Sequence, residues 1–211
     1  MRRLLSGSAA LAILATTFLG GGAASATEGT SPEAQPTAST TVVINEISTR
    51  GQNGLQDQFI ELRNVSPRVV DLTGYVLRVY GPSNNLIDTI ALPAGLQLQP
   101  RDNLGQYAVL VAKNFSGTIQ DQTNVVPFNL MGDQAIPSTG GVALLNQTGV
   151  KVDGIGFSMA VTSAREGQPA VPETQATEQK NVANARDVLS TDTDNNRVDF
   201  SLHQRTPGAD N

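Results

Sequence analysis

Cysteine and tryptophan are absent from the sequence, and histidine occurs once. Without cysteine the chain has no disulfide framework, no thiolate nucleophile and no Cys-based zinc or iron–sulfur site. A single imidazole offers too few ligands for a transition-metal centre. Aromatic residues make up only 4% of the chain. We therefore expect a core of Val, Leu and Ile that is stabilised by packing.

Basic residues are also few, with 14 Lys and Arg against 19 Asp and Glu and a net charge of -5. They form no cluster along the sequence. Nucleic-acid affinity comes largely from Lys and Arg that contact phosphates. The composition therefore predicts that the chain does not bind nucleic acid.

The N-terminus has the organisation of a signal peptide. Arg2 and Arg3 precede an apolar stretch, and Ala24-Ser25-Ala26 has the small-x-small form that signal peptidase cleaves. The apolar stretch ends at Gly20, whereas a membrane anchor needs roughly 20 apolar residues. We expect residues 1–26 to be a signal peptide cleaved after Ala26, which leaves a secreted, extracellular protein without a membrane anchor.

Residues 27–40 contain Ser, Thr, Pro, Glu and Ala but no aromatic or large aliphatic side chain. Such a segment cannot bury enough apolar surface to fold, and it is interpreted as a flexible linker. Residues 41–211 are long enough for one domain with its own core. We expect this domain to be all-β.

Short runs of β-branched and aliphatic residues alternate with turn residues throughout the domain, as in an antiparallel β-sandwich. Residues 141–146 and 150–157 flank Gln147-Thr148-Gly149 and predict a hairpin. Residues 173–189 are compatible with a helix or with a long loop. A last short strand is expected at 199–201. The other predicted strands are 41–47, 58–64, 70–80, 86–92 and 107–112.

Three groups of motifs occur in a fixed order along this domain. VINEI at 43–47, FIELRN at 59–64 and VDLTGYVL at 70–77 form the first group. The others are GGVALLN at 140–146 with VDGIGF at 152–157, and DTDNN at 192–196 with the terminal TPGADN at 206–211.

Together these motifs resemble the lamin tail domain family, whose members include secreted bacterial proteins. The resemblance implies an immunoglobulin-like antiparallel β-sandwich. Tyr75 stands where the family usually has Trp, and the segment 159–189 is longer than a tight connection. Bacterial members often adjoin nuclease or phosphatase domains, but fold alone does not confer an activity.

Few residues are candidates for catalysis. His203 is the only histidine, and no G-x-S-x-G motif supplies a serine nucleophile. Glu46 and Glu61 lie within predicted strands and, on neighbouring strands, could act as an acid and base pair. The alternative is that they lie at the sheet surface or bind loop amides. We assign no catalytic residue and expect a protein that is not an enzyme and needs no cofactor.

Calcium is the one ion for which the sequence offers candidate ligands, which are Asp192, Asp194, Asn196 and Asp199. Their spacing repeats the first positions of a calcium loop. However, Arg197 replaces the turn glycine, and Gln204 stands where a bidentate Glu is required. A turn in which these side chains bind backbone amides is the alternative.

Taken together, the sequence favours a secreted, non-catalytic binding or structural module whose partner is an extracellular protein or a cell-envelope component. One alternative is a metal-dependent hydrolase or an accessory domain of a secreted nuclease or phosphatase system. Another is a calcium-dependent adhesion module. The sequence does not specify an oligomeric state.

Overall fold

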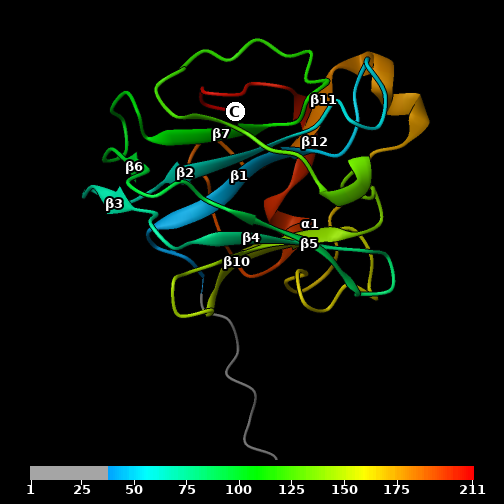
Figure 1. The fold of residues 1–211 in the computed structure, drawn as a ribbon, viewed down its shortest axis with the longest axis horizontal. Helices are drawn as coiled ribbons and strands as arrows, with labels where there is room; N and C mark the ends of the chain where they lie inside the picture. Colours follow the sequence, from blue (N-terminus) through cyan, green and yellow to red (C-terminus); the bar gives the residue numbers. More distant parts are fainter. Residues whose placement is uncertain (1–37) are drawn as a thin grey trace, which may run out of the picture. The chain divides into compact units, whose positions relative to one another are not determined.

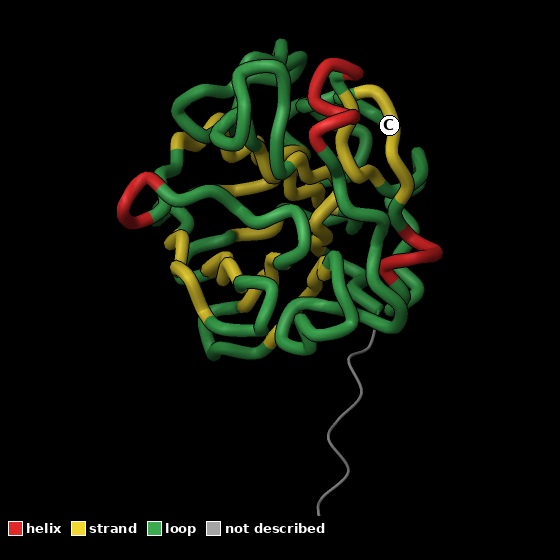
Figure 2. The backbone as a smooth tube through the Cα atoms, turned by 90° about the vertical axis from the view of Figure 1, so that its right-hand side faces the viewer, coloured by secondary structure: helices red, strands yellow, loops and turns green. Residues whose placement is uncertain are grey.

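The computed structural model describes residues 38–211. Strands and loops make up nearly all of this part of the chain (Figure 2). The predicted signal peptide and residues 27–37 of the predicted linker lie outside the described residues. The last linker residues contact the domain, since the Ser39 amide donates to Asp192 Oδ2 at 2.6 Å. No helix in the described part of the chain has the length and apolar character needed to cross a membrane.

Two sheets form the layers of the domain (Figure 1). In spatial order, the six-stranded sheet consists of β12 (Ser201–Gln204), β11 (Val182–Ala185), β1 (Val42–Ser48), β2 (Phe59–Asn64), β7 (Tyr107–Val111) and β8 (Val125–Pro127). The four-stranded sheet consists of β10 (Lys151–Gly156), β9 (Gly141–Leu145), β4 (Val76–Tyr80) and β5 (Leu86–Ala91).

All neighbouring strands in these two sheets are antiparallel except β7 and β8, which are parallel. A small sheet pairs β3 (Val70–Asp71) with β6 (Gln97–Leu98). Three short helical turns complete the described part, namely η1 (Met131–Asp133), η2 (Gln175–Lys180) and α1 (Asn196–Asp199). The architecture is the immunoglobulin-like β-sandwich that the sequence predicts.

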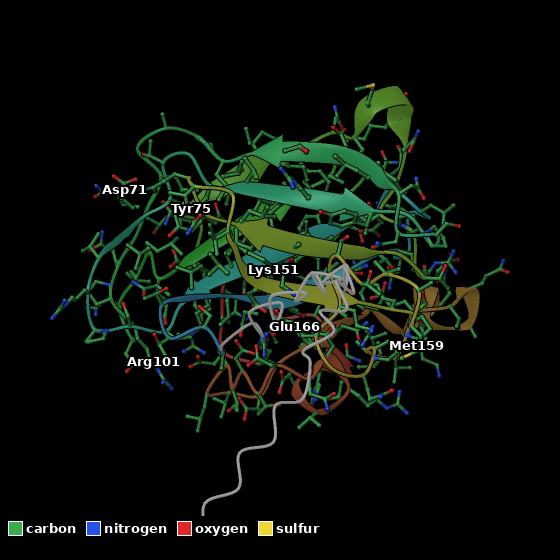
Figure 3. The ribbon with its side chains drawn as sticks, turned by 90° about the horizontal axis from the view of Figure 1, so that it is seen from below. Asp71, Tyr75, Arg101, Lys151, Met159 and Glu166 are labelled. Atoms are coloured by element: carbon green, nitrogen blue, oxygen red, sulfur yellow. The ribbon has the colours of Figure 1, made fainter. Side chains whose placement is uncertain are left out.

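The core lies between the two sheets and is mainly aliphatic, as predicted. Strand side chains alternate between two faces, so each strand contributes every second residue to the core. Tyr75, which is labelled in Figure 3, is half-buried and packs against this core. Fully buried members from both sheets include Ile44, Leu62, Leu77, Val79, Leu110, Val142, Leu144 and Ile155.

Several expected elements are confirmed and others are not. The hairpin of β9 and β10 forms as predicted, with Lys151 opposite Leu145. The strand predicted at 70–80 is divided into β3 and β4, because Gly74 turns the chain at φ +80°. The last short strand, predicted at 199–201, forms as β12 and begins only at Ser201, because Asp199 ends α1.

The segment 173–189 contains η2 and then β11, so it is neither a long helix nor only a loop. The sequence of β11 is VANA. Alanine and asparagine are depleted in strands, which is why the pattern did not predict one. Nevertheless β11 lies inside the six-stranded sheet, between β1 and β12.

The aliphatic core leads to a direct test at Leu77, whose side chain is 0% exposed. Leu77→Ala should lower the free energy of unfolding by about 2–5 kcal/mol, because it removes buried methyl groups and leaves a cavity. Urea denaturation measures the change. The matched control is Leu104→Ala, because Leu104 is 82% exposed and should change stability little. Equal losses in the two variants would contradict the assigned core.

Candidate functional site

A bulge in β1 is the starting point of the candidate site. The register of β1 against β2 shifts between Ile44 and Glu46. A bulge leaves backbone groups without partners in the ladder. Here side chains from distant segments satisfy them: the Ile44 amide donates to Asp153 Oδ2 at 2.6 Å, and the Ile44 carbonyl accepts from Arg186 Nε at 2.9 Å. The bulge therefore joins β1 to β10 and to the residue after β11.

Arg186 follows β11 and is completely buried. Its guanidinium forms ion pairs with Asp153 at 2.9 Å, with Asp199 at 3.2 Å and with Asp192 at 3.4 Å. It also donates to the Thr191 carbonyl, at 2.7 Å. The Phe200 ring packs against the guanidinium, with its centroid 4.5 Å from Cζ. A buried charge is tolerated only when it is paired and hydrogen-bonded, and Arg186 meets both conditions.

Glu166 adds a further carboxylate to this cluster. One side-chain oxygen from each of Asp153, Glu166 and Asp192 lies within 4.8 Å of those of the other two. Glu166 Oε1 lies 3.2 Å from Lys151 Nζ, and the two residues are neighbours in Figure 3. Burial, together with the charge of Asp153, raises the pKa of Glu166 to about 9 against the opposing effect of Lys151. We call these three acids and Arg186 the carboxylate–arginine cluster.

The calcium candidates of the sequence lie near one another in the fold, but most of their side chains already have other partners. Asp192 belongs to the carboxylate–arginine cluster. Asp199 pairs with Arg186 and accepts from the Thr193 amide and hydroxyl. The side chain of Asn196 bonds to backbone groups of Gly154, Gly156 and Glu166.

Asp194 is only partly buried, and its amide donates to Asp192 Oδ1 at 3.2 Å. These residues therefore hold the loop after β11 and the helix α1 against β10, mostly through hydrogen bonds with backbone amides. This is the turn-forming role that the sequence left open beside calcium binding. Binding of one calcium ion by all four candidates stays a prediction.

Glu46 and Glu61 face each other on β1 and β2, as the motif positions suggested, and both are fully buried. A surface position was expected as one alternative, and that alternative was wrong. The reason is the C-terminal segment 205–211, which covers this face of the sheet. Glu46 accepts from the Thr206 amide at 3.1 Å, and Glu61 accepts from the Gly208 amide at 2.6 Å.

The same segment is held by two buried arginines. Arg205 pairs with Asp57 at 3.0 Å, and Arg63 pairs with Asp210 at 2.7 Å. Gly208 has φ +80°, and a Cβ atom there would lie 2.5 Å from the Asp121 amide nitrogen, so glycine is required. Glu46 and Glu61 thus bind backbone amides, which is the other alternative that the sequence left open.

His203 lies exposed on β12, at the edge of the six-stranded sheet. Its Nε2 is 2.7 Å from Ser201 Oγ, two residues away on the same strand. Both side chains are exposed on a regular strand, whereas hydrolysis needs an oxyanion site and an enclosed position for the substrate. The contact is therefore a side-chain pair at the surface of the strand.

Three important residues were not identified from the sequence as site residues, namely Asp153, Glu166 and Arg186. Asp153 lies within one of the family motifs, so the sequence predicted the strand that contains it but not the contacts of its side chain. Glu166 and Arg186 lie in segments with no recognisable pattern. The three residues come together because β10, the loop after β10 and the residue after β11 lie close to one another in the fold.

The fold and these contacts define a class, the immunoglobulin-like modules. Within this class the chain belongs to the lamin tail domain family, because the family model matches residues 35–158, more than half of the chain. Among curated proteins no sequence matches the chain significantly. The match ends before β11, so Glu166, Arg186 and the C-terminal motifs lie beyond the matched residues.

Replacing Arg186 tests the carboxylate–arginine cluster. Arg186→Met should lower the free energy of unfolding by about 3–5 kcal/mol, because it leaves buried carboxylates without their counter-charge. Chemical denaturation measures the loss. Arg68→Met is the matched control, since Arg68 is exposed and should tolerate the change. A small loss for Arg186→Met would show that the carboxylates do not need the arginine.

The paired glutamates predict how stability depends on pH. Burial, with repulsion from Glu61, raises the pKa of Glu46 from 4.5 to about 9, and burial raises that of Glu61 to about 8. The folded chain therefore holds protons that the unfolded chain releases above pH 4.5. Stability should fall as pH rises from about 5 to 9, by at most about 1.4 kcal/mol per pH unit for each group.

Glu46→Gln should flatten this slope, because one titrating carboxyl and its repulsion of Glu61 are removed. Denaturation curves at several pH values measure the slope. Asp102→Asn is the control, since Asp102 is exposed and its carboxyl is far more accessible to water than that of Glu46. An unchanged slope in Glu46→Gln would contradict the assignment of the proton to this pair.

Proposed function

We propose that this protein is a secreted, non-catalytic module that binds an extracellular protein or a cell-envelope component. The observation that carries the proposal is that the C-terminal segment covers Glu46 and Glu61. Both carboxylates bind backbone amides of the C-terminal segment, which covers them. A general acid or base must reach its substrate, and these two acids do not. The immunoglobulin-like fold and family membership support a module of this type.

The loops and free sheet edges are the parts of such a module that meet a partner. β12, β8 and β5 each have a single neighbouring strand, so one side of each backbone has no partner strand among residues 38–211. Three of the four residues of β12 are exposed. By contrast, the outer edge of β10 is covered, because the Asn196 side chain bonds to Gly154 and Gly156. β12, β8 and β5 are therefore the edges through which the module would add a partner strand.

Export through a signal peptide at residues 1–26 is part of the same proposal. It rests on the charged start, the apolar stretch and the Ala24-Ser25-Ala26 motif. The absence of cysteine is compatible with an extracellular site, because the buried ion pairs and the aliphatic core stabilise the domain without disulfides.

Retention of the purified protein by separated cell-wall, membrane and protein fractions tests the binding role. We expect at least one fraction to retain it, in a saturable manner and in competition with unlabelled protein. An acidic protein of similar size and net charge is the control for non-specific retention. Failure of every fraction to retain the protein would contradict the proposal.

An activity screen tests the non-catalytic part separately. Phosphoester and glycan substrates, with and without divalent metals, should not be turned over by the purified protein. Hydrolysis that is lost in both Glu46→Gln and Glu61→Gln, while each variant remains folded by circular dichroism, would establish the hydrolase alternative instead.

A further inference from the structure

We propose that the domain binds one divalent cation, in the first place Ca²⁺, through the carboxylates of Asp153, Glu166 and Asp192. This site differs from the linear calcium loop considered from the sequence, with which it shares only Asp192. Its ligands come from β10, from the loop that follows β10 and from the loop after β11. The inference does not depend on the proposed binding role.

The spacing of the donor atoms fits such an ion. One carboxylate oxygen from each of the three residues lies within 4.8 Å of the other two. Calcium binds oxygen at about 2.3–2.6 Å, so two of its ligands lie at most about 5 Å apart. Carboxylates are the ligands that hard cations prefer, and no nitrogen or sulfur ligand is needed. The three oxygens therefore already span a distance that one ion can bridge.

The unpartnered oxygen of Glu166 is the observation that points to a ligand. The Glu166 side chain is 2% exposed, and its Oε1 lies 3.2 Å from Lys151 Nζ. Its Oε2 is buried and has no hydrogen-bond partner among residues 38–211. A buried acceptor without a partner destabilises the fold, and a charged one does so more strongly. A cation bound between the three carboxylates would satisfy this oxygen.

The charges of the cluster support a divalent ion. Four buried carboxylates, those of Asp153, Glu166, Asp192 and Asp199, face two cationic side chains, Arg186 and Lys151. When a bound cation displaces the proton of Glu166, these groups have a net charge of -2, which one divalent cation balances. The charge of Arg186 is already included in this sum. Its guanidinium is fixed by five contacts, which join it to β1, β10, α1 and the loop after β11.

Lys151 lies where a cation would enter the site from solvent and leave it again. Its side chain is 21% exposed, whereas those of Asp153 and Asp192 are 0% and 4% exposed. The lysine ammonium and a metal ion compete for the same Glu166 carboxylate. Removing the lysine should therefore strengthen cation binding, while removing the glutamate charge should weaken it. These opposite effects distinguish a cation site from an acidic cluster with a purely structural role.

Calorimetric titration of the purified, chelator-treated protein with Ca²⁺ and with Mg²⁺ tests the proposal, together with thermal melts in Ca²⁺ and in chelator. We expect one Ca²⁺ per chain and a melting temperature that rises with Ca²⁺. Glu166→Gln should weaken Ca²⁺ binding at least about tenfold, because affinity follows the number of charged ligands. Lys151→Gln should strengthen it.

Two controls match these variants in charge. Asp102→Asn removes an exposed acid and Lys113→Gln removes a partly exposed lysine, and neither should change Ca²⁺ affinity. The Gln variant of Glu166 keeps the shape of the side chain, so its fold is expected to persist and is checked by circular dichroism.

Three results would contradict the proposed site or the proposed ion. If Glu166 is instead satisfied by a proton, Ca²⁺ gives no binding heat and no change in melting temperature, and Glu166→Gln is as stable as the original protein in both solutions. That result would overturn the proposal. Binding that Glu166→Gln leaves intact would place the ion elsewhere and would overturn it as well. Preference for Mg²⁺ would overturn the choice of Ca²⁺.

Discussion

The buried guanidinium of Arg186 is the interaction on which the rest of the C-terminal half depends. It neutralises Asp153 from the four-stranded sheet and Asp199 from α1, and it caps the Ile44 carbonyl at the bulge of β1. One side chain thus joins both sheets and the loop after β11. Because its removal would leave several buried charges unpaired, the position tolerates no neutral residue without a large loss of stability.

The C-terminal segment completes the sandwich in a second way. Residues 205–211 cover the face of β1 and β2 that carries Glu46 and Glu61, and their amides bind both carboxylates. Arg63 and Arg205 fix the same segment through Asp210 and Asp57. The six-stranded sheet therefore has an aliphatic core on one face and a polar, charged layer on the other. Buried polar networks of this kind favour one specific arrangement of the chain.

The sequence predicted structure that depends on neighbouring residues, but it did not predict contacts between segments that lie far apart in the chain. Alternating apolar residues and turn motifs predicted most strands and the hairpin of β9 and β10, because those signals are local. β11 was missed, since Ala183, Asn184 and Ala185 have low strand propensity and pair only through neighbours distant in sequence. The burial of Glu61 was missed for the same reason, because the covering segment lies about 147 residues later.

The candidate site shows this limit most clearly. Asp192 was a candidate ligand from its spacing, but Asp153, Glu166 and Arg186 have no sequence spacing that would group them. They meet because two bulged strands and two loops converge. A pattern search detects ligands from one loop, whereas a site assembled from several segments becomes visible only in three dimensions.

The central claim is that Arg186 and Asp153 are energetically coupled and hold the two sheets together. A double-mutant cycle of Arg186→Met and Asp153→Asn, measured by chemical denaturation, tests it most directly. We predict a coupling energy of about 2 kcal/mol or more, because each single variant leaves a buried charge that the double variant lacks. Additive losses, with a coupling energy near zero, would contradict the account.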